Sequence, residues 1–197
     1  MRLLLIGPPG SGKGTQAVAI AAHFGITHIS SGEILRQHVR EGTALGRSVS
    51  EAISRGDLVS DGIVMDILRK PVEAASRAGG YVLDGFPRTV AQAESAYLIA
   101  REIGSWVQAA ISLEVPREEL IARMERRGHQ EGRTDDRQDV MRHRIDMFDE
   151  QTPPMLAYYA ARETLLRVDG NRPVAEVTET LITELERIRP TLARSTG

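Results

Sequence analysis

The first pattern able to do chemistry spans residues 7–15, which read Gly-Pro-Pro-Gly-Ser-Gly-Lys-Gly-Thr. Glycines at these positions let successive backbone N–H groups point at phosphate oxygens, and Lys13 adds a movable positive charge. The spacing predicts a phosphate-binding loop between a strand and a helix, and disfavours a plain glycine-rich turn. The residues that we expect to touch phosphate are Gly10, Ser11, Gly12, Lys13, Gly14 and Thr15.

A second pattern lies at residues 81–88, which read Tyr-Val-Leu-Asp-Gly-Phe-Pro-Arg. An apolar strand here would deliver Asp84 to the carboxyl end of a sheet, where open α/β folds bind ligands. The following turn aims Arg88 across the same edge, and the spacing predicts that Gln92 shares a helical face with Arg88. The amide of Gln92 can both donate to and accept from the edge of a purine base.

Asp84 is the candidate for holding Mg²⁺ through water, because this ion usually keeps several waters in proteins. The generic phosphate loop also supplies a hydroxyl directly after its lysine, but Gly14 stands there and Thr15 comes one residue later. Two interpretations stay open: either Thr15 binds the metal, or phosphates and water alone do.

Residues 30–36, Ser-Ser-Gly-Glu-Ile-Leu-Arg, have the form of a capping box. Ser30 would cap a helix and Glu33 would reach back to it. Arg36 lies about one turn further on, where its guanidinium could bind a phosphate. Taken alone, however, Arg36 is better interpreted as a solvated surface charge.

Eight arginines and seven acids lie between residues 117 and 144. Salt bridges on a helical surface account for some of them. Arg123 and Arg127 are four residues apart on an expected helix, and Arg133 and Arg144 follow. Phosphoryl transfer needs positive donors around the moving group, a role that suits arginine.

Short apolar runs bounded by glycine and aspartate alternate with helical spacing along the whole chain. Together with the phosphate loop at residues 7–15, this alternation predicts an α/β fold of the P-loop NTPase type, a five-stranded parallel sheet with helices on both faces. The expected strands are residues 3–6, 28–29, 81–83, 109–115 and 165–168.

We expect a single domain over residues 1–197, interrupted by two small insertions. Residues 30–59 predict a helical insertion, and residues 127–137 are polar and glycine-spaced, which predicts a surface loop. The core would then comprise residues 1–29, 60–126 and 138–197.

The composition narrows the possible partners. Twenty-seven acids against 25 bases give a net charge of −2, so neither nucleic acid nor an anionic membrane is an expected partner. The chain has no cysteine, and its five histidines show no ligand spacing, so we expect no zinc. No apolar run approaches the ~20 residues that span a bilayer, and we expect a cytoplasmic protein.

Together these motifs resemble the adenylate kinase family, in the family's order, from residue 1 to about 187. The resemblance rests on Gly-Lys-Gly-Thr after Pro-Pro, on residues 30–36 and 84–92, and on Gly-Asp-Leu-Val at 56–59. It implies a monomer that transfers the γ-phosphoryl group of MgATP to AMP, giving two ADP. The family usually has Thr where Ser31 stands and Asp where Glu33 stands.

The resemblance also implies roles for single residues. Arg36 and Arg88 would hold the AMP phosphate, and Gln92 would read adenine. The implied AMP site is Ser31, Arg36, Asp57, Leu58, Val59, Gly85, Phe86, Pro87, Arg88, Gln92, Arg133 and Arg144. The insertion at 30–59 would bind the nucleoside monophosphate, and residues 127–137 would form a short lid.

On the ATP side, the resemblance implies that Arg123 packs on adenine, that Arg127 holds phosphates, and that Arg172 lies in a loop touching adenine. Arg133 and Arg144 would clamp the transferring phosphoryl group and the AMP phosphate. The implied catalytic set is Lys13, Arg88, Arg127, Arg133 and Arg144.

The sequence also bears on three other functions. UMP/CMP kinases share the fold but usually have Ala at the position of Ser31 and asparagines after Asp-Gly-Phe-Pro-Arg. A GTPase-type switch needs Asn-Lys-x-Asp, whereas Arg172 follows Asn171, the only asparagine of this chain. Shikimate kinase shares the phosphate loop but would not supply the pairing of Arg88 with Gln92.

Overall fold

A computed structural model describes residues 1–131, 138–162 and 164–194, but not the side chains at 127–131, 138, 164, 193 and 194. The strands are β1 (Arg2–Ile6), β2 (Thr27–Ser30), β3 (Tyr81–Asp84), β4 (Ala109–Glu114) and β5 (Thr164–Asp169). The helices are α1 (Lys13–Phe24), α2 (Ser31–Arg40), α3 (Ala44–Arg55), α4 (Asp61–Arg77), α5 (Val90–Glu102), α6 (Arg117–Glu131), α7 (Gln138–Arg162) and α8 (Val174–Arg194).

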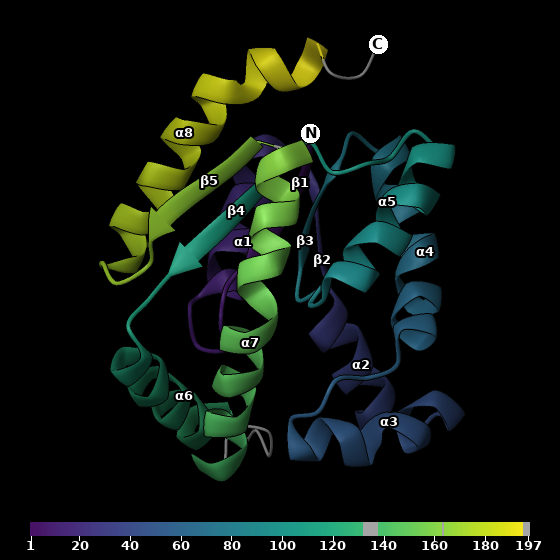
Figure 1. Ribbon diagram of the computed structural model, residues 1–197, viewed down its shortest axis with the longest axis vertical. Helices are drawn as coiled ribbons and strands as arrows, with labels where there is room; N and C mark the ends of the chain where they lie inside the picture. Colours follow the sequence, from purple (N-terminus) through teal and green to yellow (C-terminus); the bar gives the residue numbers. More distant parts are fainter. Residues whose placement is uncertain (132–137, 163, 195–197) are drawn as a thin grey trace.

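The five strands form one parallel sheet in the order β2-β3-β1-β4-β5, which confirms the predicted fold class. In Figure 1 the arrowheads of β4 and β5 point toward the end of the molecule that holds α2, α3 and α6. The carboxyl ends of parallel strands are where such sheets bind ligands. The topology therefore brings the loops after β1, β2 and β3 to one edge.

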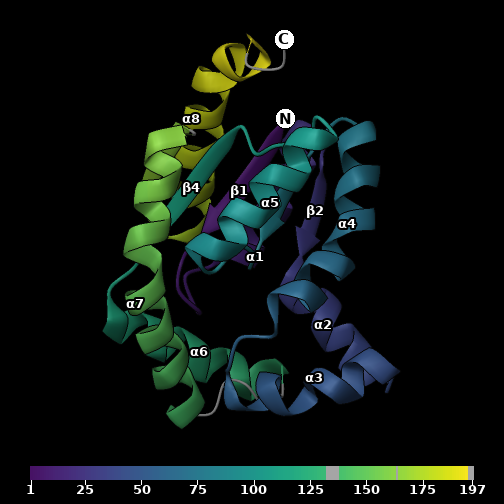
Figure 2. The same cartoon turned by 45° about the vertical axis from the view of Figure 1, so that its right-hand side comes forward.

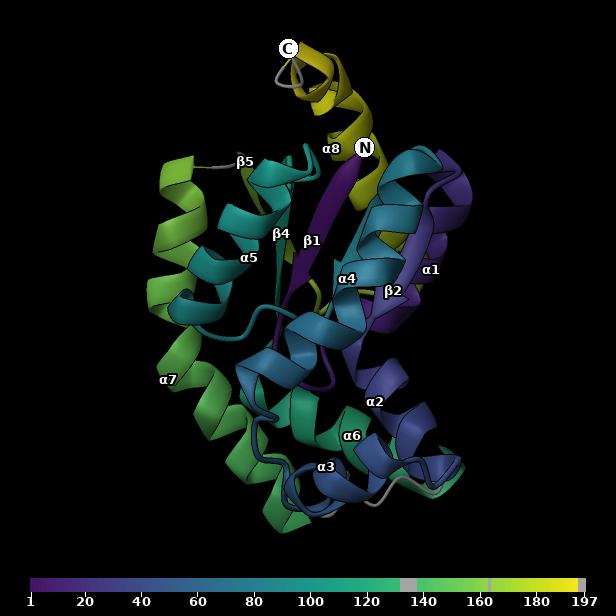
Figure 3. The same cartoon turned by 90° about the vertical axis from the view of Figure 1, so that its right-hand side faces the viewer.

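Residues of β1 alternate between two apolar clusters on opposite faces of the sheet. Leu3 and Leu5 pack with α1 and α8, whereas Leu4 and Ile6 pack with α4, α5 and α7. Figure 3 shows α1 on one side of β1 and α5 and α7 on the other. Burial on both faces explains why this strand is an unbroken apolar run rather than an alternating one.

Two helical pairs extend beyond the carboxyl edge of the sheet. Helices α2 and α3 follow β2, which runs directly toward α2 in Figure 2. Helices α6 and α7 are joined by their own small core of Leu120, Met124, Met141 and Ile145. Within the described residues, no helix is long and apolar enough to cross a membrane.

The expected strands are all present, but one expected loop is wrong in part. Residues 127–131 continue α6 as far as Glu131, although the glycine-spaced segment 127–137 predicted a surface loop. Arginine, glutamine and glutamate favour helix, and a single glycine costs only about 1 kcal/mol there. Residues 132–137 lie outside the described part of the chain, and the domain boundaries stay predictions.

Candidate active site

The phosphate loop connects β1 to α1 and places Lys13 in the first turn of that helix. The helix begins at Lys13, directly after Gly12, which caps it in the left-handed region at φ 89°. Residues with a side chain rarely adopt that conformation. The Lys13 Nζ donates to the carbonyl oxygens of Gly7 at 2.7 Å and Pro8 at 2.9 Å, which holds the ammonium over the loop.

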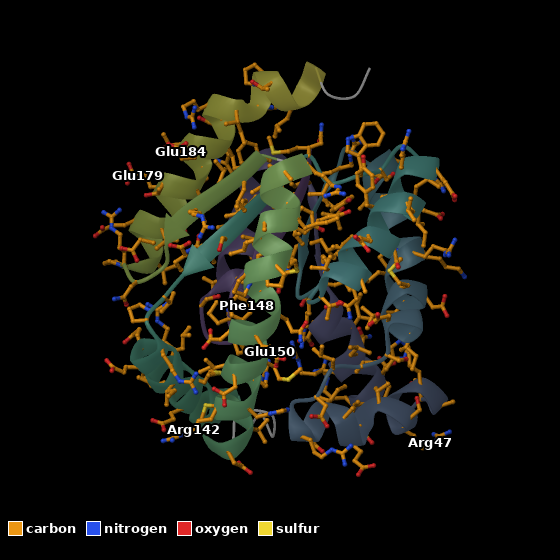
Figure 4. The ribbon with its side chains drawn as sticks, viewed as in Figure 1. Arg47, Arg142, Phe148, Glu150, Glu179 and Glu184 are labelled. Atoms are coloured by element: carbon orange, nitrogen blue, oxygen red, sulfur yellow. The ribbon has the colours of Figure 1, made fainter. Side chains whose placement is uncertain are left out.

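A large cavity of about 410 Å³ opens in front of this loop. Its walls include Gly10, Gly12, Lys13, Gly14 and Thr15 from the loop and α1, and Asp84 from β3. On the far side α7 contributes Met147, Phe148, Gln151, Thr152 and Met155; Phe148 is labelled midway along α7 in Figure 4. The cavity thus combines loop N–H groups, an ammonium and a carboxylate, a set that fits a polyphosphate with its metal.

Asp84 ends β3 and is only 8% exposed. Burial raises the pKa of this carboxyl, but the hydrogen bond from His28 and the charge of Lys13 outweigh burial and leave the pKa below its usual value. His28 Nε2 lies 3.4 Å from Asp84 Oδ2. Asp84 is therefore ionised at neutral pH, as a ligand for metal-bound water must be.

A small cavity of about 50 Å³ adjoins the large one. Gly85, at φ 82°, turns the chain after β3, and a Cβ there would come within 2.8 Å of the Ser31 hydroxyl. The close approach brings the start of α2 against the end of β3. The walls of this cavity include Ser31, Arg36, Asp57, Leu58, Val59, Gly85, Phe86, Arg88, Gln92 and Arg144.

Three arginines, Arg36, Arg88 and Arg144, line both cavities. They come from α2, from the turn after β3 and from α7, and more than fifty residues separate each one from the next. Arg88 is held by its Nε, which donates to the Gly85 carbonyl at 2.9 Å. Arg36 pairs with Glu33 at 3.1 Å. The junction between the cavities is therefore a cluster of guanidinium groups suited to phosphate.

The structure does not bring every predicted residue to these cavities. Among the described residues, Ser11 is buried and faces neither cavity, and Arg172 pairs with Glu176 at 2.7 Å. Arg123 pairs with Glu119 and donates to the Gly170 carbonyl, beside the loop after β5. The side chain of Arg127 and all of Arg133 lie outside the described residues, so their roles stay predictions.

Two local expectations are wrong. Arg88 does not share a helical face with Gln92, because α5 begins only at Val90; instead the backbone N–H of Arg88 donates to the Gln92 side chain. The capping box forms only in part. Ser30 accepts from the Glu33 N–H, but the Glu33 carboxylate pairs with Arg36 and Arg40 rather than reaching back.

His28 and Asp61 are neighbours of the site that the sequence patterns did not single out. The histidines show no ligand spacing in the sequence, yet His28 lines the large cavity beside Asp84. Its position in a short strand that leads to the ligand-binding edge was the available signal. Asp61 Oδ1 accepts from Gln92 Nε2 at 2.7 Å, a contact over 31 positions that no local pattern reveals.

The parallel sheet, the phosphate loop and the two adjoining cavities define a nucleotide-binding protein of the P-loop class with room for a second ligand. A family model described as adenylate kinase matches residues 5–164. The chain belongs to the adenylate kinase family.

Three relatives, each named adenylate kinase, are similar over most of the chain. The protein of Xanthomonas oryzae pv. oryzae is 43% identical and the alignment covers 98% of this chain and 100% of that protein. The protein of Kocuria rhizophila is 41% identical, covering 94% of this chain and 99% of its own. The protein of Thermus thermophilus is 44% identical, covering 85% and 88%.

Proposed function

We propose that this protein is a nucleoside monophosphate kinase that transfers the γ-phosphoryl group of MgATP to AMP, giving two ADP. The observation that carries the proposal is the placement of Arg36, Arg88 and Arg144 at the junction of two cavities. One cavity is lined by a phosphate loop and the other by an amide able to read a base. A phosphoryl group moving between two nucleotides would have to cross this junction.

The reaction needs no covalent bond to the protein. An oxygen of the AMP phosphate attacks the γ-phosphorus, the bond from that phosphorus to the β,γ-bridging oxygen of ATP breaks, and that oxygen leaves with its electron pair as a terminal oxygen of ADP. Lys13 and the loop N–H groups hold the donor, and the three arginines stabilise the charge on the transferring oxygens. Catalysis then consists of positioning, charge neutralisation and exclusion of water.

The residues present fit a magnesium ion held mainly by phosphates and water. Asp84 is ionised and buried at the cavity wall, and the described residues contain no cluster of three His, Asp or Glu that would cage a metal. Bound Mg²⁺ would neutralise charge on the β- and γ-phosphates. Asp84 would accept hydrogen bonds from the waters of that ion.

Replacing Asp84 by asparagine should raise the Mg²⁺ concentration needed for half-maximal activity by about 10–100-fold, the usual cost of losing an outer partner of a metal. Because its pKa lies below the usual Asp value, Asp84 stays ionised to a lower pH than an ordinary aspartate, and its contribution is lost only as the pH falls through that lowered pKa. The magnesium dependence of initial rates between pH 5 and 8 measures the effect. An unchanged magnesium requirement would contradict the role of Asp84.

The acceptor is tested by measuring ADP formation from ATP with AMP, CMP, UMP and GMP in turn. We expect AMP to give the highest kcat/KM, and little ADP to form from ATP alone. A preference for UMP or CMP would support the UMP/CMP kinase alternative, and no transfer to any monophosphate would refute the proposal. The monomeric state, the cytoplasmic location and the absence of nucleic-acid and membrane partners stay predictions.

A further inference from the structure

The side-chain amide of Gln92 is held at both ends by partners of opposite kind. Its Oε1 accepts from the backbone N–H of Arg88 at 2.7 Å, and its Nε2 donates to Asp61 Oδ1 at 2.7 Å. A carboxylate only accepts and a backbone N–H only donates. Turning the amide over would set oxygen against oxygen and N–H against N–H, so these two partners determine its orientation.

The backbone of Gln92 is fixed as well. Gln92 lies in the first turn of α5, where its N–H donates to the Oγ1 of the capping residue Thr89 at 3.2 Å. The residue is only 2% exposed, and it lines the small cavity. Its amide is therefore a rigid, oriented group in the wall of a binding site.

We propose that Asp61 is a positioning residue for base recognition, holding the Gln92 amide in the orientation that accepts a 6-aminopurine and disfavours a 6-oxopurine. This inference rests on the proposed function, in which the small cavity receives the base of AMP. Each end of the amide keeps one more hydrogen-bonding position: an N–H on Nε2 and a lone pair on Oε1.

The remaining donor and acceptor match the amino edge of adenine, which offers the N6 amino group as donor and N1 as acceptor. Hypoxanthine, the base of IMP, has the reverse pattern, with O6 as acceptor and N1–H as donor. The held amide would meet that edge with like groups facing each other, and unpaired polar groups in a closed site weaken binding. Asp61 thereby contributes to the choice of acceptor.

Asp61 acts through Gln92 and not by touching the ligand, since it is the first residue of α4, is exposed and does not line either cavity. An acid at this point also interacts favourably with the amino-terminal end of the helix. Neutral variants separate the hydrogen bond to Gln92 from the effect of a negative charge at the start of the helix. Asparagine loses the charge but keeps an oxygen that can accept from Gln92, whereas alanine loses both.

The test compares kcat/KM for AMP with kcat/KM for IMP in Asp61→Ala, Asp61→Asn and the wild type. We expect the AMP-over-IMP ratio to fall about tenfold in Asp61→Ala and to stay near the wild-type value in Asp61→Asn, with KM for ATP unchanged in both. Asp66→Ala, at an exposed position of the same helix, is the matched control and should leave the ratio unchanged. Thermal unfolding of each variant reports any change in stability.

A double-mutant cycle tests the route of the effect. If Asp61 works by orienting Gln92, then adding Asp61→Ala to the Gln92→Ala variant should cause no further change in the ratio. An unchanged ratio in Asp61→Ala, or an equal loss in Asp61→Asn, would overturn the inference while leaving the proposed function intact. A wild-type protein that does not phosphorylate AMP would instead overturn the proposed function, and the inference with it.

Discussion

Lys13→Ala is expected to lower kcat by about 100-fold or more at saturating ATP and AMP. Lys13 extends from the first turn of α1 and its Nζ donates to two carbonyls of the phosphate loop, which keeps the ammonium where we expect the phosphates of ATP to bind. Charge on the transferring group spreads over its equatorial oxygens during the reaction. The contact with Lys13 therefore strengthens in the transition state, and removing this side chain should lower kcat.

The chain offers a matched control, because Lys70 is its only other lysine and lies exposed on α4. Lys70→Ala removes the same charge and should leave kcat unchanged. Steady-state rates, with ATP affinity measured separately by calorimetry, distinguish a loss of catalysis from a loss of binding. A Lys13→Ala enzyme with kcat within about threefold of the wild type would refute the role of the phosphate loop.

The second large effect is expected from Arg88→Ala, which should lower kcat/KM for AMP by roughly 100-fold or more. Removing one partner of a close charge pair costs about 2–5 kcal/mol, much of it from the charge left unpaired. Arg88 lines both cavities and is anchored at Nε by the Gly85 carbonyl, so its guanidinium stands at the junction. Binding of ATP alone should change little.

Arg88→Lys sharpens this test because it keeps the positive charge and removes the planar guanidinium with its paired N–H donors. Lysine cannot reproduce a bidentate contact, so we expect only partial recovery of kcat/KM for AMP. Arg101→Ala, near the end of α5 and exposed, serves as the control for loss of a surface arginine. Recovery to the wild-type value in Arg88→Lys would show that charge alone is needed and would contradict a bidentate role.

Local chemistry explains what could be predicted from the sequence. A phosphate loop needs glycines and a lysine within nine residues, and buried parallel strands are short apolar runs whatever their order in the sheet. Both signals lie within single segments, so the loop between a strand and a helix at this place and all five strands were predicted correctly. Asp84, at the end of an apolar run, could likewise be placed on the binding edge before its neighbours were known.

Helix ends and side-chain partners were predicted less well, because they depend on competition between nearby groups. Polar composition suggested a loop after residue 126, but a helix tolerates one glycine among good helix formers, and α6 continues to Glu131. Glu33 could have completed a capping box, yet it pairs with Arg36 and Arg40 on the same helix.

The sequence alone thus determined the class of fold, the phosphate loop and the residues worth testing, since each depends on a short local motif. Only the tertiary structure showed that Arg36, Arg88 and Arg144 meet at one junction, that His28 faces Asp84, and that Asp61 holds Gln92. These contacts join segments that are far apart along the chain. They exist because packing on both faces of the sheet brings those segments to its carboxyl edge. That arrangement cannot be predicted from the periodicity of any single segment.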